Sequence, residues 1–139
     1  MNPNDNTIIA LAFDIGLKRT GVAVGQSINK TARPVTQLLV SNGRHDWAAI
    51  DTLIQQWQPN LIVIGKANSS DPHLNKAINR VKSHIQQNHK LPIIDVDERL
   101  STVAANAELK KQDLKHKQKK ILRDQVAACL ILESYFNDL

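Results

Sequence analysis

The sequence predicts an α/β fold: a mixed five-stranded sheet, with three antiparallel strands followed by parallel crossovers, flanked by helices. Two observations carry this prediction. Three apolar segments follow one another without a helical pattern, as in an antiparallel meander, and later apolar segments alternate with amphipathic helices, which is typical of parallel crossovers. With 139 residues and 42% hydrophobic content, the chain is expected to form a single domain over residues 1–139.

The first three predicted strands cover residues 8–14, 21–26 and 34–40. The first of them is continuously apolar, which is expected of a central strand buried on both faces. It ends in Asp14, and a turn bounded by Gly16 and Gly21 leads into the second strand. Gly43 then interrupts the chain after the third strand.

The remaining predicted elements alternate between helices and strands. The first helix has its apolar residues at helical spacing and ends before a proline: Trp47, Ile50, Leu53, Ile54, Trp57 and Pro59. Asp71 followed by Pro72 predicts the capped start of a second helix, whose apolar stripe continues to Ile85. Strands are predicted at 61–65 and 91–96, and further helices at about 101–111 and about 119–136.

The chain is basic, with a formal net charge of +5 and a pI near 9.5. A basic surface suits a polyanionic partner such as nucleic acid, and it also serves solubility. Positive charge is densest in residues 110–123, which fit either a phosphate-tracking arm or a solvated helix face. We favour the arm, and four of its cations are predicted to bind nucleic acid: Lys117, Lys119, Lys120 and Arg123.

Composition also excludes several classes of protein. The polar N-terminus does not resemble a signal peptide, and no apolar stretch is long enough to span a membrane. The single cysteine, Cys129, excludes an internal disulfide and a cysteine-rich zinc site, so we expect a cytoplasmic protein without membrane association. The five histidines show no metal-ligand spacing, and His84 and His89, five residues apart, are expected at the surface.

Three acidic residues occupy positions where a carboxylate needs a partner. Asp14 and Glu98 follow apolar strands, and Asp124 lies on the apolar stripe of the last helix. Asp14 could instead be an ordinary turn residue, Glu98 could interact with Arg99 or a helix N-terminus, and Asp124 could pair with Lys120 or Arg123. If the three converge at one end of the sheet, they can share one or two Mg²⁺ (or Mn²⁺) ions, because magnesium prefers carboxylate oxygens. Such a site supports phosphodiester cleavage by water.

Five blocks of the sequence form a specific pattern. They are Asp14-Ile15-Gly16 with Lys18-Arg19, Gly21-Val22-Ala23-Val24-Gly25, Thr31-Ala32-Arg33-Pro34, Asp97-Glu98-Arg99-Leu100-Ser101-Thr102, and Asp124 ahead of Ala127-Ala128 and Ile131-Leu132-Glu133-Ser134-Tyr135-Phe136. In this order, and over nearly the whole chain, the blocks resemble the YqgF/RuvX family. The N-terminal block and the Asp-Glu-Arg-Leu-Ser-Thr block together make the resemblance specific.

This resemblance implies an RNase H-like fold related to the Holliday-junction resolvase RuvC. Family members are described as Holliday-junction resolvases and as nucleases that process the ends of precursor 16S ribosomal RNA. By the matching motifs, the resemblance implies that Asp14, Glu98 and Asp124 are the catalytic, metal-binding acids. It also implies four candidate phosphate contacts: Lys18, Arg19, Arg33 and Arg99.

The expected function is therefore that of a Mg²⁺-dependent endonuclease on structured nucleic acid. Processing of the 5′ end of precursor 16S ribosomal RNA in ribosome biogenesis is the first expectation, and resolution of branched DNA junctions is the alternative. Expected partners are structured RNA, branched DNA or a pre-ribosomal particle. The chain is expected to act as a monomer or a weak homodimer.

One segment departs from the family pattern. After its fourth strand the family usually reads Gly-Leu-Pro and then an Asn-Met-Asp-Gly-like loop, whereas this chain reads Gly65-Lys66-Ala67-Asn68-Ser69-Ser70-Asp71-Pro72. The departure leaves open a non-catalytic, nucleic-acid-binding ribosome-assembly factor on the same fold. Actin-like and sugar-kinase modules also open with Asp-x-Gly after an apolar strand, but they need a second domain that 139 residues cannot supply.

Overall fold

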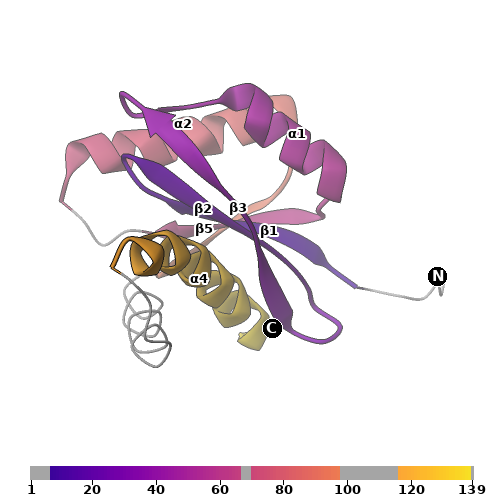
Figure 1. Cartoon of the computed structure of the whole chain (residues 1–139). Helices are drawn as coiled ribbons and strands as arrows, with labels where there is room; N and C mark the ends of the chain where they lie inside the picture. Colours follow the sequence, from indigo (N-terminus) through magenta and orange to yellow (C-terminus); the bar gives the residue numbers. More distant parts are fainter. Residues whose placement is uncertain (1–6, 67–69, 98–115, 139) are drawn as a thin grey trace.

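The computed structural model describes residues 7–66, 70–97 and 116–138, whose strands form a six-stranded sheet in the order β4-β3-β2-β1-β5-β6 (Figure 1). The strands are β1 Ile9–Ile15, β2 Arg19–Gln26, β3 Thr31–Ser41, β4 Arg44–His45, β5 Leu61–Lys66 and β6 Ile93–Asp97. β1 to β4 pair antiparallel, whereas β5 pairs in parallel with both β1 and β6. The predicted mixed sheet, an antiparallel meander followed by parallel crossovers, is confirmed.

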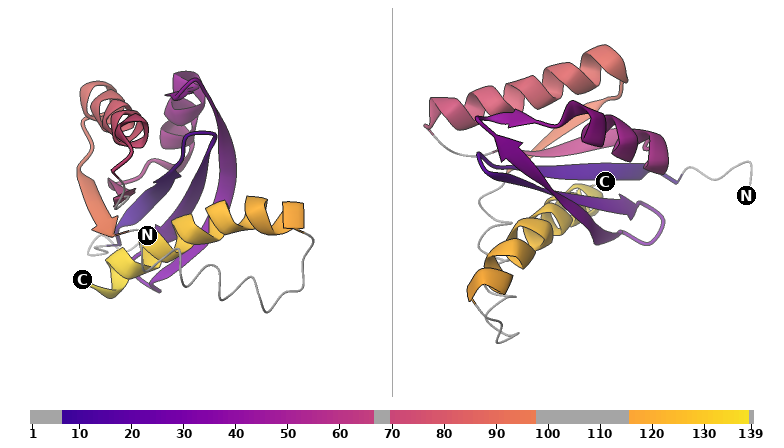
Figure 2. Two further views of the ribbon diagram at one scale, coloured as in Figure 1. Left: turned by 90° about the vertical axis from the view of Figure 1, so that its left-hand side faces the viewer. Right: turned by 45° about the horizontal axis from the view of Figure 1, so that its top comes forward.

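Helices cover both faces of the sheet, as Figure 2 shows. α1 (Trp47–Trp57) and α2 (Pro72–Asn88) lie on one face, and α4 (His116–Asn137) lies on the other. None of the helices in the described part of the chain combines the length and apolar content needed to cross a bilayer. The helix predicted over about 101–111 lies outside the described residues.

The sequence of β1 explains the two layers. Its side chains alternate between the faces, because successive residues of a strand point to opposite sides. Leu11, Phe13 and Ile15 belong to the core under α1 and α2, whereas Ala10 and Ala12 belong to the core under α4. The large residues fill the space below two helices, and the alanines let α4 approach the sheet closely.

Two aspartates begin the helices on the first face. The Oδ1 atom of Asp46 accepts a hydrogen bond from the backbone N–H of Ala49 at 3.3 Å, which caps α1. The Oδ1 atom of Asp71 accepts one from the backbone N–H of His73 at 2.9 Å, and Pro72 occupies the first turn of α2. Such caps satisfy backbone donors that have no partner inside the helix. The predicted Asp71–Pro72 start is therefore confirmed.

The prediction of five strands was one strand short. β4 pairs with the end of β3 through Val40 opposite His45 and Ser41 opposite Arg44. The two-residue connection, Asn42-Gly43, has φ values of 53° and 73°. Positive φ at both central residues fits a type I′ hairpin turn, whose twist matches that of the strands. Gly43 therefore does more than interrupt the chain after β3, because it turns the chain into a sixth strand.

A β-bulge changes which residues of β3 face each layer. Thr36 is opposite Val22, but the next pair is Pro34 opposite Ala23, so Val35 is the extra residue. An extra residue in one strand shifts the alternation of side chains by one position. Consequently Ala32 packs with the core under α4, whereas simple alternation back from Leu38 would place it on the other face.

α4 approaches β2 closely at Gly25. A Cβ built at this position would lie 2.9 Å from Cε2 of Phe136 and 3.0 Å from Cδ2 of Leu132. Gly25 is opposite Ala10, at the start of β1. The C-terminal half of α4 therefore lies over the beginning of β1, and its N-terminal half extends toward the edge where β1 ends (Figure 1).

Candidate functional site

Asp14 lies near the end of the central strand β1 and is 9% exposed. It continues the alternation of Ala10 and Ala12, so it lies on the face of the sheet that α4 covers. Its cross-strand partner is Gly21, which has no side chain to occupy the space beside the carboxylate. The sequence therefore produces a nearly buried carboxylate at one edge of the sheet, next to an open position on β2.

The ends of three parallel strands meet at this edge. Phe13 of β1 is opposite Ile64 of β5, and Lys66 at the end of β5 is opposite Asp97 at the end of β6. Asp14 is therefore level with Gly65, one residue before the end of β5, and β6 ends level with β5. Carboxyl ends of parallel strands are common positions for functional groups in α/β folds. Glu98, which directly follows Asp97, lies outside the described residues.

Asp124 belongs to α4, in the half of the helix that extends toward the Asp14 edge. It precedes the fully buried Ala128 by four residues, which is about one helical turn. The backbone therefore carries position 124 on the same stripe as the core-facing residues of α4. Its side chain lies outside the described part of the structure, so the predicted convergence of three acids stays a prediction.

Two of the predicted phosphate contacts lie at the same edge as Asp14. Lys18 is exposed in the turn between β1 and β2, and its carbonyl accepts a hydrogen bond from the N–H of Val40 at 2.9 Å. Arg19 begins β2 two residues before Gly21, so alternation places it on the α4 face, diagonally across from Asp14. The turn thus brings two positive charges to the edge where the carboxylate lies.

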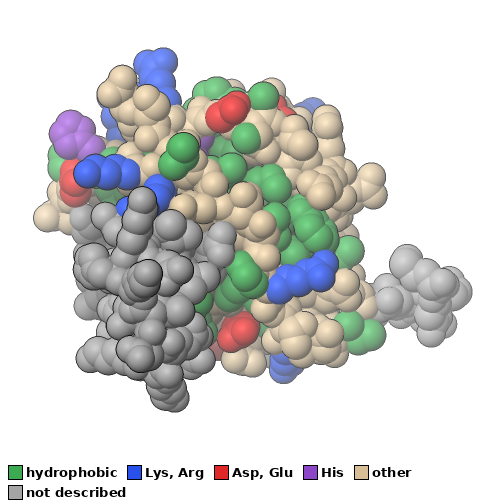
Figure 3. Space-filling view, viewed as in Figure 1, with side chains coloured by type: hydrophobic (Ala, Val, Ile, Leu, Met, Phe, Trp, Pro, Cys, Tyr) green, Lys and Arg blue, Asp and Glu red, His purple; other side chains and the backbone are tan. Residues whose placement is uncertain are grey.

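Arg33 lies away from Asp14. Because of the bulge in β3, it is opposite Val24 on the face of the sheet that α1 and α2 cover. Its guanidinium carbon is 5.2 Å from the ring centroid of Trp57, within the range of a cation–π contact. The exposed face in Figure 3 shows scattered Lys and Arg side chains between apolar ones. The structure therefore does not bring Arg33 together with the acid, Lys18 and Arg19.

The other predicted nucleic-acid contacts are only partly described. Arg99 lies outside the described residues. The backbone of the basic run is helical from His116, so its last part forms the first turns of α4. The side chains of the four cations in these turns lie outside the described part: Lys117, Lys119, Lys120 and Arg123.

Two buried polar residues, Thr20 and His45, form a hydrogen-bonded pair near the edge of the sheet where Asp14 lies. Thr20 Oγ1 and His45 Nε2 are 2.6 Å apart, and the two residues are 0% and 5% exposed. The pair links β2 to the short strand β4. Burial lowers the pKa of His45 below its usual 6.5, because the interior disfavours the charged ring.

A second cluster of chemically capable side chains lies between α1 and α2. Nε2 of His84 and Nε2 of His89 both lie 2.7 Å from Oδ1 of Asp51. The side chains of His84 and His89 are only 16% and 15% exposed, so the expectation of two surface histidines was wrong. Among the described residues, Asp51, His84 and His89 are the group whose donor atoms are close enough to hold a metal ion.

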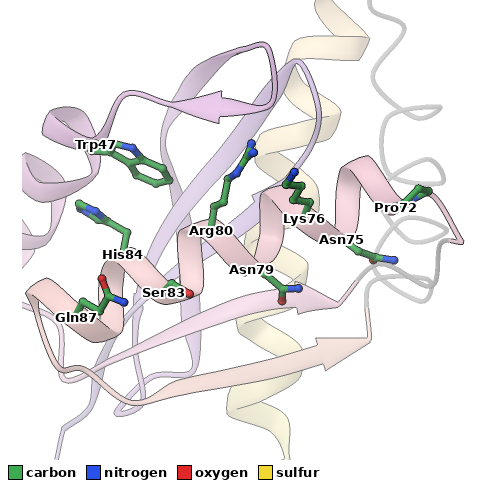
Figure 4. Close-up of a pocket in the computed structure, with 9 residues that line it drawn as sticks. All are labelled: Trp47, Pro72, Asn75, Lys76, Asn79, Arg80, Ser83, His84 and Gln87. Carbon is green, nitrogen blue, oxygen red and sulfur yellow. The ribbon is translucent and has the colours of Figure 1, made fainter.

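His84 also lies at one end of a groove of about 640 Å³ along α2 (Figure 4). Trp47 of α1 faces His84 across this end, and Arg80 points from α2 toward the β3–β4 hairpin. Nη1 of Arg80 lies 3.4 Å from the carbonyl O of Gly43, to which it donates. The groove lies on the helix-pair face, and Asp14 lies on the α4 face.

Solved structures share this arrangement of strands and helices. T. thermophilus RuvC in complex with Holliday junction substrate gives a TM-score of 0.58 at 13% identity, and the match covers 94% of each chain. The fowlpox virus Holliday junction resolvase gives 0.61 at 18% identity, covering 95% of this chain and 100% of that one. Similarity at these identities shows the fold, and it confirms the RNase H-like architecture expected from the sequence.

Closer relatives appear at the level of sequence. A Haemophilus ducreyi protein named "Putative pre-16S rRNA nuclease" is 37% identical over 131 residues, which cover 92% of this chain and 95% of the relative. A Coxiella burnetii protein (strain RSA 331) of the same name is 37% identical over 139 residues, covering 98% and 96%. The family model described as "RuvX: Holliday junction resolvase" matches residues 8–138. The chain therefore belongs to the RuvX family.

Proposed function

We propose that this protein is a metal-dependent endonuclease that processes the 5′ end of precursor 16S ribosomal RNA in the cytoplasm. The observation that carries the proposal is Asp14, a nearly buried carboxylate near the ends of three parallel strands, on the face of the sheet that α4 covers. Precursor 16S ribosomal RNA as the substrate is supported by the names of two relatives, whose matches cover more than nine tenths of both chains.

The donor set suits a hard cation. Asp14 supplies carboxylate oxygens, and Glu98 and Asp124 would supply more if they lie where the resemblance implies. These three residues would hold Mg²⁺, which takes oxygen ligands and keeps several waters. When bound, the metal would lower the pKa of a coordinated water and stabilise the leaving oxygen.

The chain's own cations would position the substrate. Lys18 and Arg19 lie in the turn beside Asp14, where their charges would offset those of the phosphates on either side of the cleaved bond. The first turns of α4 would extend this contact along the nucleic acid, because four cations occupy them: Lys117, Lys119, Lys120 and Arg123. We exclude Arg33 from this set, since it stacks on Trp57 on the opposite face.

The proposal is tested by incubating the purified protein and Mg²⁺ with precursor 16S ribosomal RNA that carries its 5′ leader. We expect cleavage that EDTA abolishes and that Asp14→Asn nearly abolishes. Asp95→Asn is the matched control, because Asp95 lies on β6, two strands away in the same sheet, is half-exposed, and pairs with Lys82 at 2.7 Å. Cleavage by Asp14→Asn at the wild-type rate would refute the proposal.

A four-way DNA junction provides the test of a second candidate function. The family description favours this candidate, since it names a Holliday junction resolvase. A resolvase cuts two strands symmetrically and requires a dimer. Paired cuts in the junction by a dimer, with the precursor RNA left intact, would assign the site to junction resolution.

Retained binding without any cutting is the third outcome. It would favour an assembly factor that binds nucleic acid on the same fold, because the loop after Gly65 departs from the family pattern. In that case Asp14→Asn would bind RNA as tightly as the wild type, since the change removes a negative charge near the phosphates.

A further inference from the structure

The cluster of Asp51, His84 and His89 has the chemistry and geometry of a metal site. Two imidazole nitrogens approach a single carboxylate oxygen at 2.7 Å each, and the three donor atoms lie within 4.8 Å of one another. Asp51 comes from α1, His84 from α2 and His89 from the residue that caps α2. The donors therefore join two helices that are separate in the sequence.

Neighbouring residues fix both rings. The ring of His84 stacks on Trp47 with a centroid distance of 4.6 Å and an angle of 17° between the planes. The backbone N–H of His89 donates to the carbonyl O of Ile85 at 2.9 Å, which ends α2 and turns this ring back toward His84. Ligands held in this way lose little rotamer freedom when they bind an ion.

The two histidines keep the carboxylate of Asp51 in its charged form. Partial burial raises the pKa of Asp51, but the hydrogen bonds from His89 and His84 outweigh this effect and lower it below the usual value. Asp51 is therefore ionised at neutral pH and accepts both hydrogen bonds, so each Nε2 carries a hydrogen.

We propose that Asp51, His84 and His89 bind a borderline divalent cation of the Zn²⁺ class, and that this ion links α1 to α2. Two imidazoles and one carboxylate suit zinc, cobalt or nickel, whereas magnesium and calcium prefer oxygen ligands throughout. Three protein ligands leave a fourth position for water. The site lies on the helix-pair face, so it is separate from Asp14 on the α4 face.

Loading the ion requires only local adjustment. Ligand atoms about 2.0–2.1 Å from a tetrahedral zinc are about 3.3 Å apart, so each N–O contact must open by about 0.6 Å. Asp51 is 37% exposed and free to rotate by this amount. Each ring must also move its hydrogen from Nε2 to Nδ1, and the Nδ1 of His84 lies 3.2 Å from Nδ2 of Asn88. Nδ2 of Asn88 also donates to the carbonyl O of His84 at 2.9 Å, so the exposed Asn88 side chain must rotate away to leave room for that hydrogen.

Calorimetric titration of the whole chain with ZnCl₂ tests the proposal. We expect binding of about one equivalent in the wild type, and at least about 10-fold weaker binding in His84→Gln and in His89→Gln. Glutamine can still donate to Asp51, so both variants keep a hydrogen bond in place of the ring. His73→Gln is the matched control, because His73 is an exposed histidine on the same helix.

Three further measurements separate this site from the proposed acidic site. Asp14→Asn should bind Zn²⁺ as the wild type does, because Asp14 lies on the other face. Zinc at about 100 times its wild-type dissociation constant should raise Tm by about 5–10 °C in the wild type, and by no more than about half as much in His89→Gln. Histidine ring nitrogen NMR should show the hydrogen of His84 on Nε2 without metal and on Nδ1 with zinc.

Absence of stoichiometric zinc binding in the wild type would overturn the proposal. Zinc binding that survives unchanged in both His84→Gln and His89→Gln would also overturn it. Loss of binding in Asp14→Asn, with both histidine variants intact, would assign the zinc to the acidic edge instead. None of these results depends on cleavage activity, so they leave the test of the proposed nuclease function independent.

Discussion

Replacement of Gly25 by alanine tests how closely α4 packs on the sheet. A Cβ at position 25 would lie 2.3 Å from the carbonyl O of Thr31, in addition to its contacts with Phe136 and Leu132. The two side chains can move aside by small rotations. The carbonyl belongs to the backbone of β3 and moves only with that strand, so this contact sets the cost of the substitution.

The size of the effect follows from these distances. Carbon and carbonyl oxygen atoms approach to about 3.3 Å in ordinary contacts, so the Thr31 carbonyl must retreat by about 1 Å. Overpacking costs about 1–3 kcal/mol, and a backbone obstacle favours the upper value. Alanine restricts the unfolded chain, which offsets about 0.4–1 kcal/mol. A net loss of about 2 kcal/mol should lower Tm by about 8 °C in a domain of this size.

Urea unfolding followed by circular dichroism measures this loss. Gly43→Ala is the control, because the nearest atom to its Cβ is 3.6 Å away and its φ of 73° costs alanine only about 1 kcal/mol. Gly25→Ala should therefore be the less stable variant. A Gly25→Ala protein within about 0.5 kcal/mol of the wild type, the range of ordinary surface changes, would refute the close packing of α4 on β2.

Three further predictions concern buried polar groups. Burial lowers the pKa of His45 below 6.5, so His45 becomes protonated in the unfolded chain before it does in the folded protein as pH falls. The free energy of unfolding should therefore decrease below about pH 6.5, by at most about 1.4 kcal/mol per pH unit. His45→Gln should flatten this slope in urea unfolding, and an unchanged slope would contradict the assignment. Thr20→Val should lower the free energy of unfolding by about 1–3 kcal/mol, because it leaves Nε2 of His45 without its hydrogen-bond partner. Thr20→Ser keeps the hydroxyl and should lower it less. Equal decreases in the two variants would exclude the hydrogen bond as the cause. Burial first, and the charge of Glu133 second, raise the pKa of the Cys129 thiol to about 12. Alkylation at about pH 8 should therefore be far slower in the native protein than in urea, and equal rates would refute this.

Elements with strong local signals could be predicted from the sequence. Asp71 followed by Pro72 marked the start of α2, and the spacing of apolar residues from Trp47 to Trp57 predicted the helix that the structure shows as α1. The apolar run before Asp14 identified the central strand and placed the acid at its end. In these cases the residues that determine the structure are neighbours in the chain, so the pattern was sufficient.

Other features depend on contacts between distant segments. The bulge at Val35 reverses the alternation in β3 and places Arg33 beside Trp57, an outcome that no local pattern in the strand indicates. The Asn42-Gly43 pair was a readable signal for a hairpin, but a two-residue strand has no hydrophobic pattern of its own to confirm it.

The histidine cluster shows the same limit at a site. Residues five apart on a continuous helix point in directions about 140° apart, so His84 and His89 did not resemble a ligand pair. They meet because α2 ends at Asn88, which frees the capping residue to turn back. Their common partner, Asp51, lies 33 residues before His84 and enters only through the packing of α1 on α2.

The central claim is that Asp14 is part of a nuclease site at the edge where the parallel strands end. Single-turnover cleavage of precursor 16S ribosomal RNA with Mg²⁺, measured for the wild type, Asp14→Asn and Asp95→Asn, tests it most directly. We predict that Asp14→Asn stays folded, binds the RNA and cleaves at least about 100-fold more slowly, while Asp95→Asn cleaves normally. Equal cleavage rates for the wild type and Asp14→Asn would contradict it.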